Sequence, residues 1–450
     1  MNFLDKLVIP QSAHHMVLLK YLLVLTFILF IPYVSVLFGS LSLSLYFKKK
    51  AAKTSDHKYL KFAKELIDLV TFNKVIAFGL GIVPVLSMTF CYSQLLHTSG
   101  ASAPEYIFIG LLLFIIAILF IYTFKYTFHL KDIFALASLK SDSADEDSKE
   151  ELNKYTANTV SLNAKSGFYG CLFLIVATYV FNAGIQMTAD PSMWGNDTGF
   201  LQVLFSLDAI AYYLQFIAGA FALTSVFLFY KNFRPNAEHK VHDEEYSVLV
   251  KHTSLTVGLI STILLPVFII ITVFTKPLDT LAYDYFGVTA IVLLLLLMLG
   301  NFFYAMIKES HTKYGTALLY LFIVVFGLLA VKDQFAFDTS TKKQYAVLAA
   351  NYEVYAEKLN EEIGGAAPPA VSGEEIYHNI CSACHKFDTK LVGPPYKETL
   401  PKYEGHMDQL VAFILNPVKK NPDYPAMPNQ GLKPNEAEAV AKYIMETYKK

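Results

Sequence analysis

Two cysteines and a histidine lie within five residues of one another in the run Cys381-Ser382-Ala383-Cys384-His385. Two cysteines three positions apart can form thioether bonds to the two vinyl groups of a haem, and the adjacent histidine can then ligate the iron. A zinc half-site is the other interpretation of this spacing. It needs two further ligands, and this part of the chain supplies no more cysteines. The run therefore predicts one covalently bound haem c.

The sixth iron ligand is expected to be a methionine ahead of the last helix. Met427 lies in residues 424–428 (Tyr-Pro-Ala-Met-Pro), where the prolines stiffen the loop and reduce the entropy lost in holding a weak ligand. Met407 comes too early in the chain, and Met445 lies within the predicted final helix. A His/Met pair fills both axial positions and raises the reduction potential relative to bis-His ligation. The pair predicts electron shuttling rather than oxygen chemistry.

Two predicted helices frame the haem motif. Gly373 begins the first helix, and Pro434 suits the first turn of the second, whose apolar stripe includes Tyr443. With these features, residues 373–450 resemble the class I cytochrome c domain over essentially its whole length. In that family the first and last helices cross with a small glycine at the contact. The resemblance gives this role to Gly373 against Tyr443.

The resemblance also covers the Gly-Pro step after the haem motif, which is Gly393-Pro394 in this chain. It implies that the Pro394 carbonyl accepts a hydrogen bond from the His385 Nδ1–H. Such a bond orients the imidazole and raises its basicity.

The remainder of the chain is unusually apolar. Of its 450 residues, 54% are hydrophobic and 17% are charged, whereas soluble domains have about 25% charged residues. The mean hydropathy is +0.40. A net charge of -1 argues against a nucleic-acid partner. Segments long enough to cross a bilayer, about 20 residues each, run over 17–47, 74–97, 105–128, 167–187, 199–230, 249–274, 284–307 and 314–332.

These segments predict an all-α fold in three parts. Residues 1–333 form a bundle of about eight transmembrane helices. Residues 334–372 form a helical extension and a Gly/Ala/Pro linker, and residues 373–450 form the small all-α cytochrome domain.

The placement of lysine predicts the orientation of this bundle. Lysines crowd the loop after the first segment, from Lys48 to Lys64, and further basic residues follow the third, fifth and seventh segments. The loops after the second, fourth and sixth segments contain only Lys276. By the positive-inside rule both termini then lie outside. We expect a multi-pass protein of the bacterial cytoplasmic membrane, embedded in lipid, with its cytochrome domain on the periplasmic side.

Titratable groups at membrane depth are functional candidates. Asp208 lies well inside the predicted helix 199–230 and is a candidate proton-path carboxylate. The alternatives are a capped or paired structural group, or a later helix start that leaves Asp208 near the lipid headgroups. Histidines near the membrane surfaces could ligate a haem b, although histidine is common at such interfaces without any ligand role, which is the favoured interpretation. They are His14, His15 and His97 near the outer surface, and His129 and His252 near the inner one.

Short stretches of the bundle resemble subunit I of the cytochrome bd oxidase superfamily. An N-out bundle of eight helices with a fused cytochrome c is similar to its divergent, quinol-independent members. The positions of that family's haem-ligating histidines hold Phe27 and Ile210 here, and its quinol-binding loop shrinks to about residues 275–283. These departures favour other ligands or the loss of membrane haems. The resembling stretches are 29–32 with Gly39, 61–64 with Phe72-Asn73, and 216–220.

Three functions remain open at this point. The first is a membrane-anchored c-type cytochrome subunit of a respiratory electron-transfer complex, with other subunits and a redox protein as partners. This is favoured over a self-sufficient oxidase. The second is a cytochrome bd-related oxidoreductase that receives electrons from its own c-haem without a quinol site. The third is a membrane enzyme or transporter that passes electrons to a fused cytochrome, for which we find no substrate motif.

Overall fold

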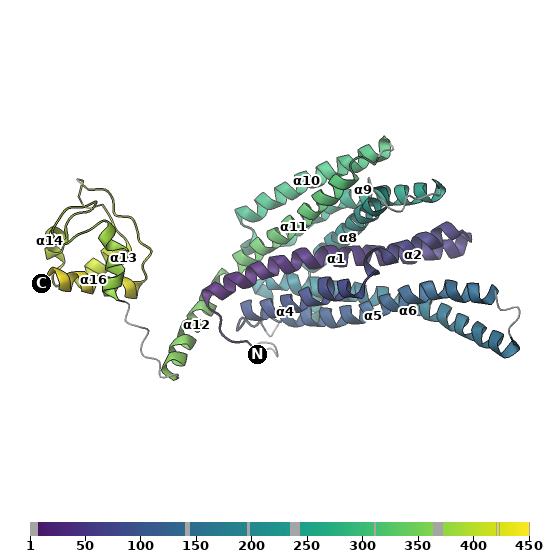
Figure 1. Cartoon of the computed structure of the whole chain (residues 1–450), viewed down its shortest axis with the longest axis horizontal. Coiled ribbons are helices and arrows are strands. Elements are labelled where there is room, and N and C mark those ends of the chain that lie inside the picture. The colour runs from purple at the N-terminus through teal and green to yellow at the C-terminus, as the bar shows by residue number, and fades with distance from the viewer. Residues whose placement is uncertain are drawn as a thin grey trace. The chain divides into compact units, whose positions relative to one another are not determined.

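The computed structural model describes residues 8–139, 145–195, 199–234, 244–309, 312–362, 372–419, 421–422 and 424–449. Within these ranges all regular structure is helical. The chain divides into two compact units, Met1–Tyr352 and Glu353–Lys450 (Figure 1). The predicted linker lies almost wholly in residues 363–371, outside the described residues.

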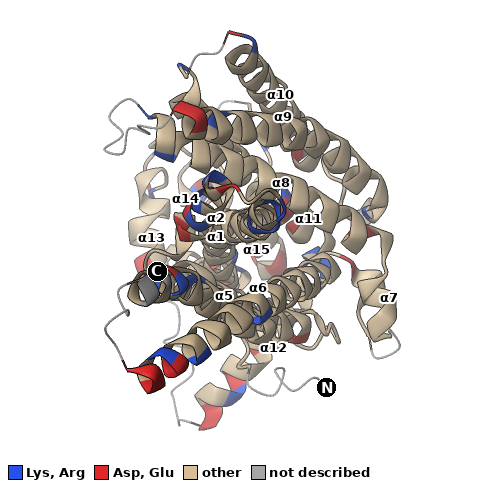
Figure 2. Ribbon diagram, turned by 90° about the vertical axis from the view of Figure 1, so that its right-hand side faces the viewer, with Lys and Arg blue, Asp and Glu red and all other residues tan. Residues whose placement is uncertain are grey.

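The first unit contains eight helical stretches that are long and apolar enough to cross a membrane, as predicted. Charged residues form short coloured segments on ribbons that are otherwise tan (Figure 2). The stretches are α1 (Ala13–Thr54), the run of α3 (Lys74–Ile76), η2 (Ala77–Ile82) and α4 (Val83–Leu95), α5 (Ala103–Leu139), α6 (Glu146–Thr188), α8 (Leu207–Phe233), α9 (Glu244–Thr275), α10 (Tyr283–Lys308) and α11 (Gly315–Ser340).

Three shorter helices connect or extend these stretches. They are α2 (His57–Thr71), α7 (Phe200–Leu204) and α12 (Lys342–Glu362).

Because the long helices alternate in direction, α1 begins at the end of the bundle where α6, α9 and α11 finish and where α8 begins. We call this the N-terminal end of the bundle.

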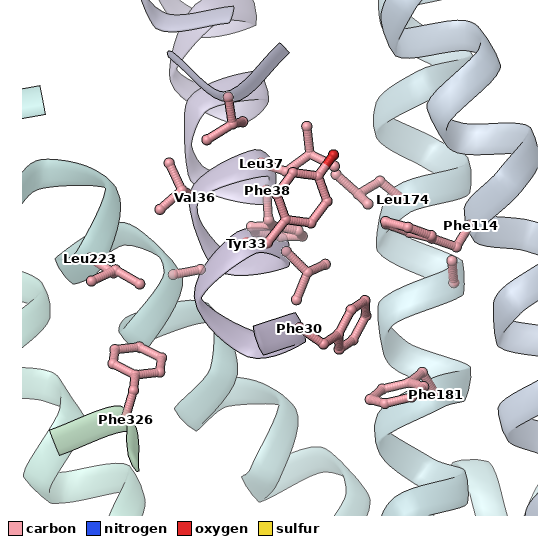
Figure 3. Packing of buried hydrophobic residues seen from close by; sticks show 14 of the residues in the cluster. Phe30, Tyr33, Val36, Leu37, Phe38, Phe114, Leu174, Phe181, Leu223 and Phe326 are labelled. Atoms are coloured by element: carbon pink, nitrogen blue, oxygen red, sulfur yellow. The ribbon is translucent and has the colours of Figure 1, made fainter. Parts of the chain in front are cut away.

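Helix α1 is the central element of this unit and contacts α4, α6, α8 and α11. Its buried side chains lie between Phe114 and Phe181 on one side and Leu223 and Phe326 on the other (Figure 3). Phe30 packs against Phe181 with ring centroids 5.1 Å apart. Aromatic burial of this kind helps to hold the central helix in place.

One glycine sets how closely α1 approaches α8. A Cβ atom added at Gly39 would come within 2.9 Å of Thr224 Cβ, closer than real side chains pack. The Thr224 hydroxyl lies 3.3 Å from the Ser35 carbonyl oxygen of α1 and can donate a hydrogen bond to it across the contact. Small residues allow such close approach between membrane helices.

The predicted fifth span was wrong in one respect: residues 199–230 are not one helix. The chain breaks after α7, and α8 begins at Leu207 with Ser206 as its N-cap. The Ser206 hydroxyl oxygen accepts a hydrogen bond from the Ala209 backbone N–H at 3.2 Å, which satisfies a donor of the first turn. Asp208 therefore lies in the first turn of α8 and not well inside a helix, a position that the helix dipole favours for an anion.

The second unit contains α13 (Gly373–Asn379), α14 (Tyr396–Thr399), α15 (Met407–Leu415) and α16 (Pro434–Tyr448). Helices α13 and α16 cross at Gly373, where an added Cβ would come within 2.9 Å of Tyr443 Cβ. Their crossing closes a small core. Its buried members are Tyr377, Tyr396, Leu400, Tyr403, Leu410, Ile414, Ala437, Val440, Ala441, Ile444 and Met445.

We expect Gly39→Val to destabilise the membrane unit by about 1–3 kcal/mol, because the added side chain forces α1 away from α8. Thermal unfolding of the detergent-solubilised protein, followed by circular dichroism, measures the change. Gly300→Val on α10 is the matched control, since a Cβ at Gly300 meets nothing within 4 Å. Equal unfolding midpoints for the two variants would contradict the close contact.

Candidate haem-binding site

The haem motif forms a tight turn directly after α13. A short 3₁₀ turn spans Cys381–Ala383, and the backbone N–H groups of Cys384 and His385 both donate to the Cys381 carbonyl oxygen, at 3.1 and 2.9 Å. This turn holds both cysteines and the histidine on one short segment. Both cysteines are free thiols and only partly buried, so each sulfur can form a thioether.

The His385 ring is held from three directions. Its Nδ1 atom lies 2.9 Å from the Pro394 carbonyl oxygen, and its plane stacks on Tyr396 with ring centroids 5.1 Å apart. On a third side a Cβ at Gly393 would come within 2.7 Å of His385 Nε2, so only glycine fits there. With Nδ1–H donating to the carbonyl, Nε2 presents its lone pair for a metal.

A cavity of about 280 Å³ brings Met427 to the same place as the motif, since Cys381, His385 and Met427 all line it. A smaller cavity of about 80 Å³ shares these residues and adds Cys384. Two thiols, an imidazole and a thioether are the donor set of a c-type haem. The walls of the larger cavity are mostly apolar, as a flat macrocycle requires; they include Leu400, Leu410, Phe413, Ile414, Leu432 and Ile444. The residues present therefore fit haem c.

Tyr396 contacts two residues of the haem motif. Its ring stacks on His385, and its hydroxyl is hydrogen-bonded to the Cys381 thiol. Burial raises the pKa of both the Tyr396 phenol and the Cys381 thiol. Both groups are therefore neutral at physiological pH.

The predicted membrane candidates occupy different surroundings. Asp208 is buried, and its oxygens lie 3.2 Å from Lys276 Nζ and 3.1 Å from Thr275 Oγ1. This is the paired arrangement that sequence analysis left as the alternative to a proton path. Two further charged residues near this pair, Lys332 and Asp333, were missed. The sequence feature that could have revealed them is a pair of adjacent charged residues at the end of the last apolar segment.

The candidate haem b histidines are spread over several helices. His14 and His15 are exposed in the first turn of α1, and His252 is exposed on α9. His129 on α5 lies 3.0 Å from an Asp68 carboxylate oxygen on α2, and the His97 carbonyl oxygen accepts a hydrogen bond from Gln344. A membrane haem b stays a prediction.

Comparisons with known proteins agree with the haem motif. The family model described as "Cytochrome C oxidase, cbb3-type, subunit III" matches residues 368–444. The chain is 36% identical over 78 residues to cytochrome c-551 of Azotobacter vinelandii, which covers 16% of this chain and 95% of that protein. Cytochrome c-551 of Pseudomonas denitrificans is 37% identical over 79 residues, with the same shares. Through this domain the chain belongs to the cytochrome c family.

Membership in the cytochrome c family confirms the predicted C-terminal domain and its covalently bound haem c. The resemblance of the membrane unit to the cytochrome bd superfamily gains no support from these matches. No solved structure matches the chain.

We expect Cys384→Ala to abolish normal attachment through two thioethers. One vinyl group then stays conjugated with the macrocycle, so the pyridine haemochrome α-band moves to longer wavelength. Cys171→Ala, at a partly buried thiol on α6, is the control and leaves the band unchanged. An unshifted band in Cys384→Ala would remove this cysteine from the attachment site.

Proposed function

We propose that this protein carries single electrons through one haem c attached to Cys381 and Cys384, with His385 and Met427 as its axial ligands. The observation that carries the proposal is the pair of adjoining cavities that both His385 and Met427 line, together with the two cysteines. A haem with both axial positions filled exchanges electrons without binding a substrate at the iron.

The chain's own residues set the properties of this site. The haem, when bound, supplies reversible one-electron chemistry. The Pro394 carbonyl fixes the His385 tautomer and raises the basicity of Nε2. Gly393 and Tyr396 hold the ring plane, so that the histidine needs no reorganisation when the charge of the site changes.

We further propose that the domain works on the periplasmic side of a bacterial cytoplasmic membrane, as a subunit of a respiratory complex. The location is supported by the lysine-rich loop after α1 and by the positive-inside rule. The respiratory role is supported by the matching family, whose description names subunit III of a cbb3-type oxidase. Other subunits of the complex and a redox protein would be the partners.

We expect Met427→Ala to lower the reduction potential and to open the sixth position of the iron, because a weak thioether ligand that favours reduced iron is lost. The reduced protein should then change from no binding of carbon monoxide to one molecule per haem. Potentiometry and visible spectroscopy of the full-length protein measure both effects.

Met407→Ala is the control for this experiment. Met407 is exposed at the start of α15 and does not line either cavity, so the potential and the carbon monoxide response should stay unchanged. An unaltered spectrum in Met427→Ala would exclude Met427 as the ligand. A haem b signal in the wild-type haemochrome spectrum would show that haem c is not the sole haem of the protein.

A further inference from the structure

Four charged side chains gather at the N-terminal end of the membrane bundle. Asp208 comes from α8, Lys276 directly follows α9, and Lys332 and Asp333 lie on α11. Lys332 is 0% exposed, and Asp208 and Lys276 are each 7% exposed. Burying charge is costly unless it is paired and hydrogen-bonded. The two pairs within this group differ sharply in how well they meet that requirement.

The Asp208–Lys276 pair is fully partnered. Lys276 Nζ lies 3.2 Å from Asp208 Oδ2 and also donates to the Gln186 side-chain oxygen. Asp208 Oδ1 accepts from the Thr275 hydroxyl at 3.1 Å. Both Asp208 oxygens are therefore hydrogen-bonded as a carboxylate, which suits a structural role.

The Lys332–Asp333 pair is not fully partnered. Lys332 Nζ lies 3.4 Å from Asp333 Oδ1, and among the described residues neither atom has a hydrogen-bond partner. Asp333 Oδ2 accepts from the Tyr212 hydroxyl. The Tyr285 hydroxyl is likewise buried without a hydrogen-bond partner in the described part of the chain, and its ring centroid lies 5.3 Å from Lys332 Nζ. Buried polar atoms of this kind are normally satisfied by ordered water.

Two cavities adjoin this group. Asp333 lines both of them, whereas Lys332 and Tyr285 line neither. The larger, of about 70 Å³, has a mostly apolar wall, in which Asp333, Tyr212, Asn182 and Gln215 are the polar residues. The smaller, of about 20 Å³, includes Lys276 in its wall. A water molecule needs a polar cavity of about 10–15 Å³, so each is large enough. The Asp333 side chain keeps 30% of its surface open, against 9% for Asp208.

We propose that Asp333 is the proton-binding carboxyl of a hydrated proton-exchange site at this end of the membrane unit. A proton passes from a water-borne hydronium in the flanking cavities to the Asp333 carboxylate and returns to water by the reverse step. Lys332 supplies the counter-charge, and the Tyr212 hydroxyl orients Oδ2. The titratable and charged groups facing the site are Lys332 on α11, Asp208 and Tyr212 on α8, Lys276 after α9, Tyr285 on α10 and Tyr92 on α4.

This function goes beyond electron transfer at the haem and does not rest on it. It also moves the proton-exchanging carboxylate from Asp208 to Asp333, because Asp333, unlike Asp208, lines both cavities and has the more exposed side chain.

Infrared spectroscopy of the full-length protein in lipid tests the proposal. Lowering the pH should produce the C=O stretch of a buried carboxylic acid, and exchange into D₂O should shift that band. Asp333→Asn should remove it. The matched control, Asp338→Asn, changes a carboxylate on the same helix that pairs with Lys20 at 3.0 Å, and it should leave the band intact.

Two milder variants decide the question if Asp333→Asn does not fold. Asp333→Glu keeps the carboxyl and should move the band, and Tyr212→Phe removes one hydrogen bond and should move it to higher frequency. Failure to find a D₂O-sensitive band in the wild type would show a permanently ionised, purely structural pair and overturn the proposal. A band that is unmoved in Asp333→Asn, or in both milder variants, would also overturn it.

Discussion

Inside a lipid bilayer there is no water to satisfy the backbone N–H and C=O groups, so each spanning segment must satisfy them within itself. This constraint explains why the membrane unit is helical and why a break in a helix needs side chains that satisfy the exposed backbone groups. The break before α8 leaves N–H groups of its first turn without partners in the helix. Ser206 caps the new N-terminus, and Asp208 then lies where the helix dipole and Lys276 both favour a negative charge.

The same constraint makes packing in the bundle depend on shape. Lipid is as apolar as the side chains, so helices gain from close contact rather than from the exclusion of water. Gly39 lets α1 lie against Thr224, and aromatic rings such as Phe30 and Phe181 fill the space where the helices are further apart. Charged groups that remain inside must be partnered or hydrated. Lys276 donates a hydrogen bond to Asp208, whereas Lys332 Nζ and Asp333 Oδ1 have no hydrogen-bond partner among the described residues.

The cytochrome domain has a different requirement, because it must build a rigid site in a small unit. Backbone groups around the haem motif and the crossing of α13 with α16 provide this rigidity. The turn after α13 collects three chemical groups in five residues, and the Pro394 carbonyl and Gly393 orient the imidazole. The crossing at Gly373 closes the core behind them. Little of this depends on long-range charge, which suits a carrier whose iron changes charge with each electron.

The sequence alone determined the features that depend on local spacing or on overall polarity. Cys381, Cys384 and His385 predict haem c because their chemistry needs only one turn of chain. The apolar segments predict the eight long helices because a bilayer sets the required length. Tertiary structure decided what depends on residues far apart. It placed Met427 and His385 on one cavity, paired Asp208 with Lys276, and joined Lys332 and Asp333 to Tyr212 and Tyr285 across three helices. Such contacts depend on how the helices cross, and the local sequence around each residue does not predict them.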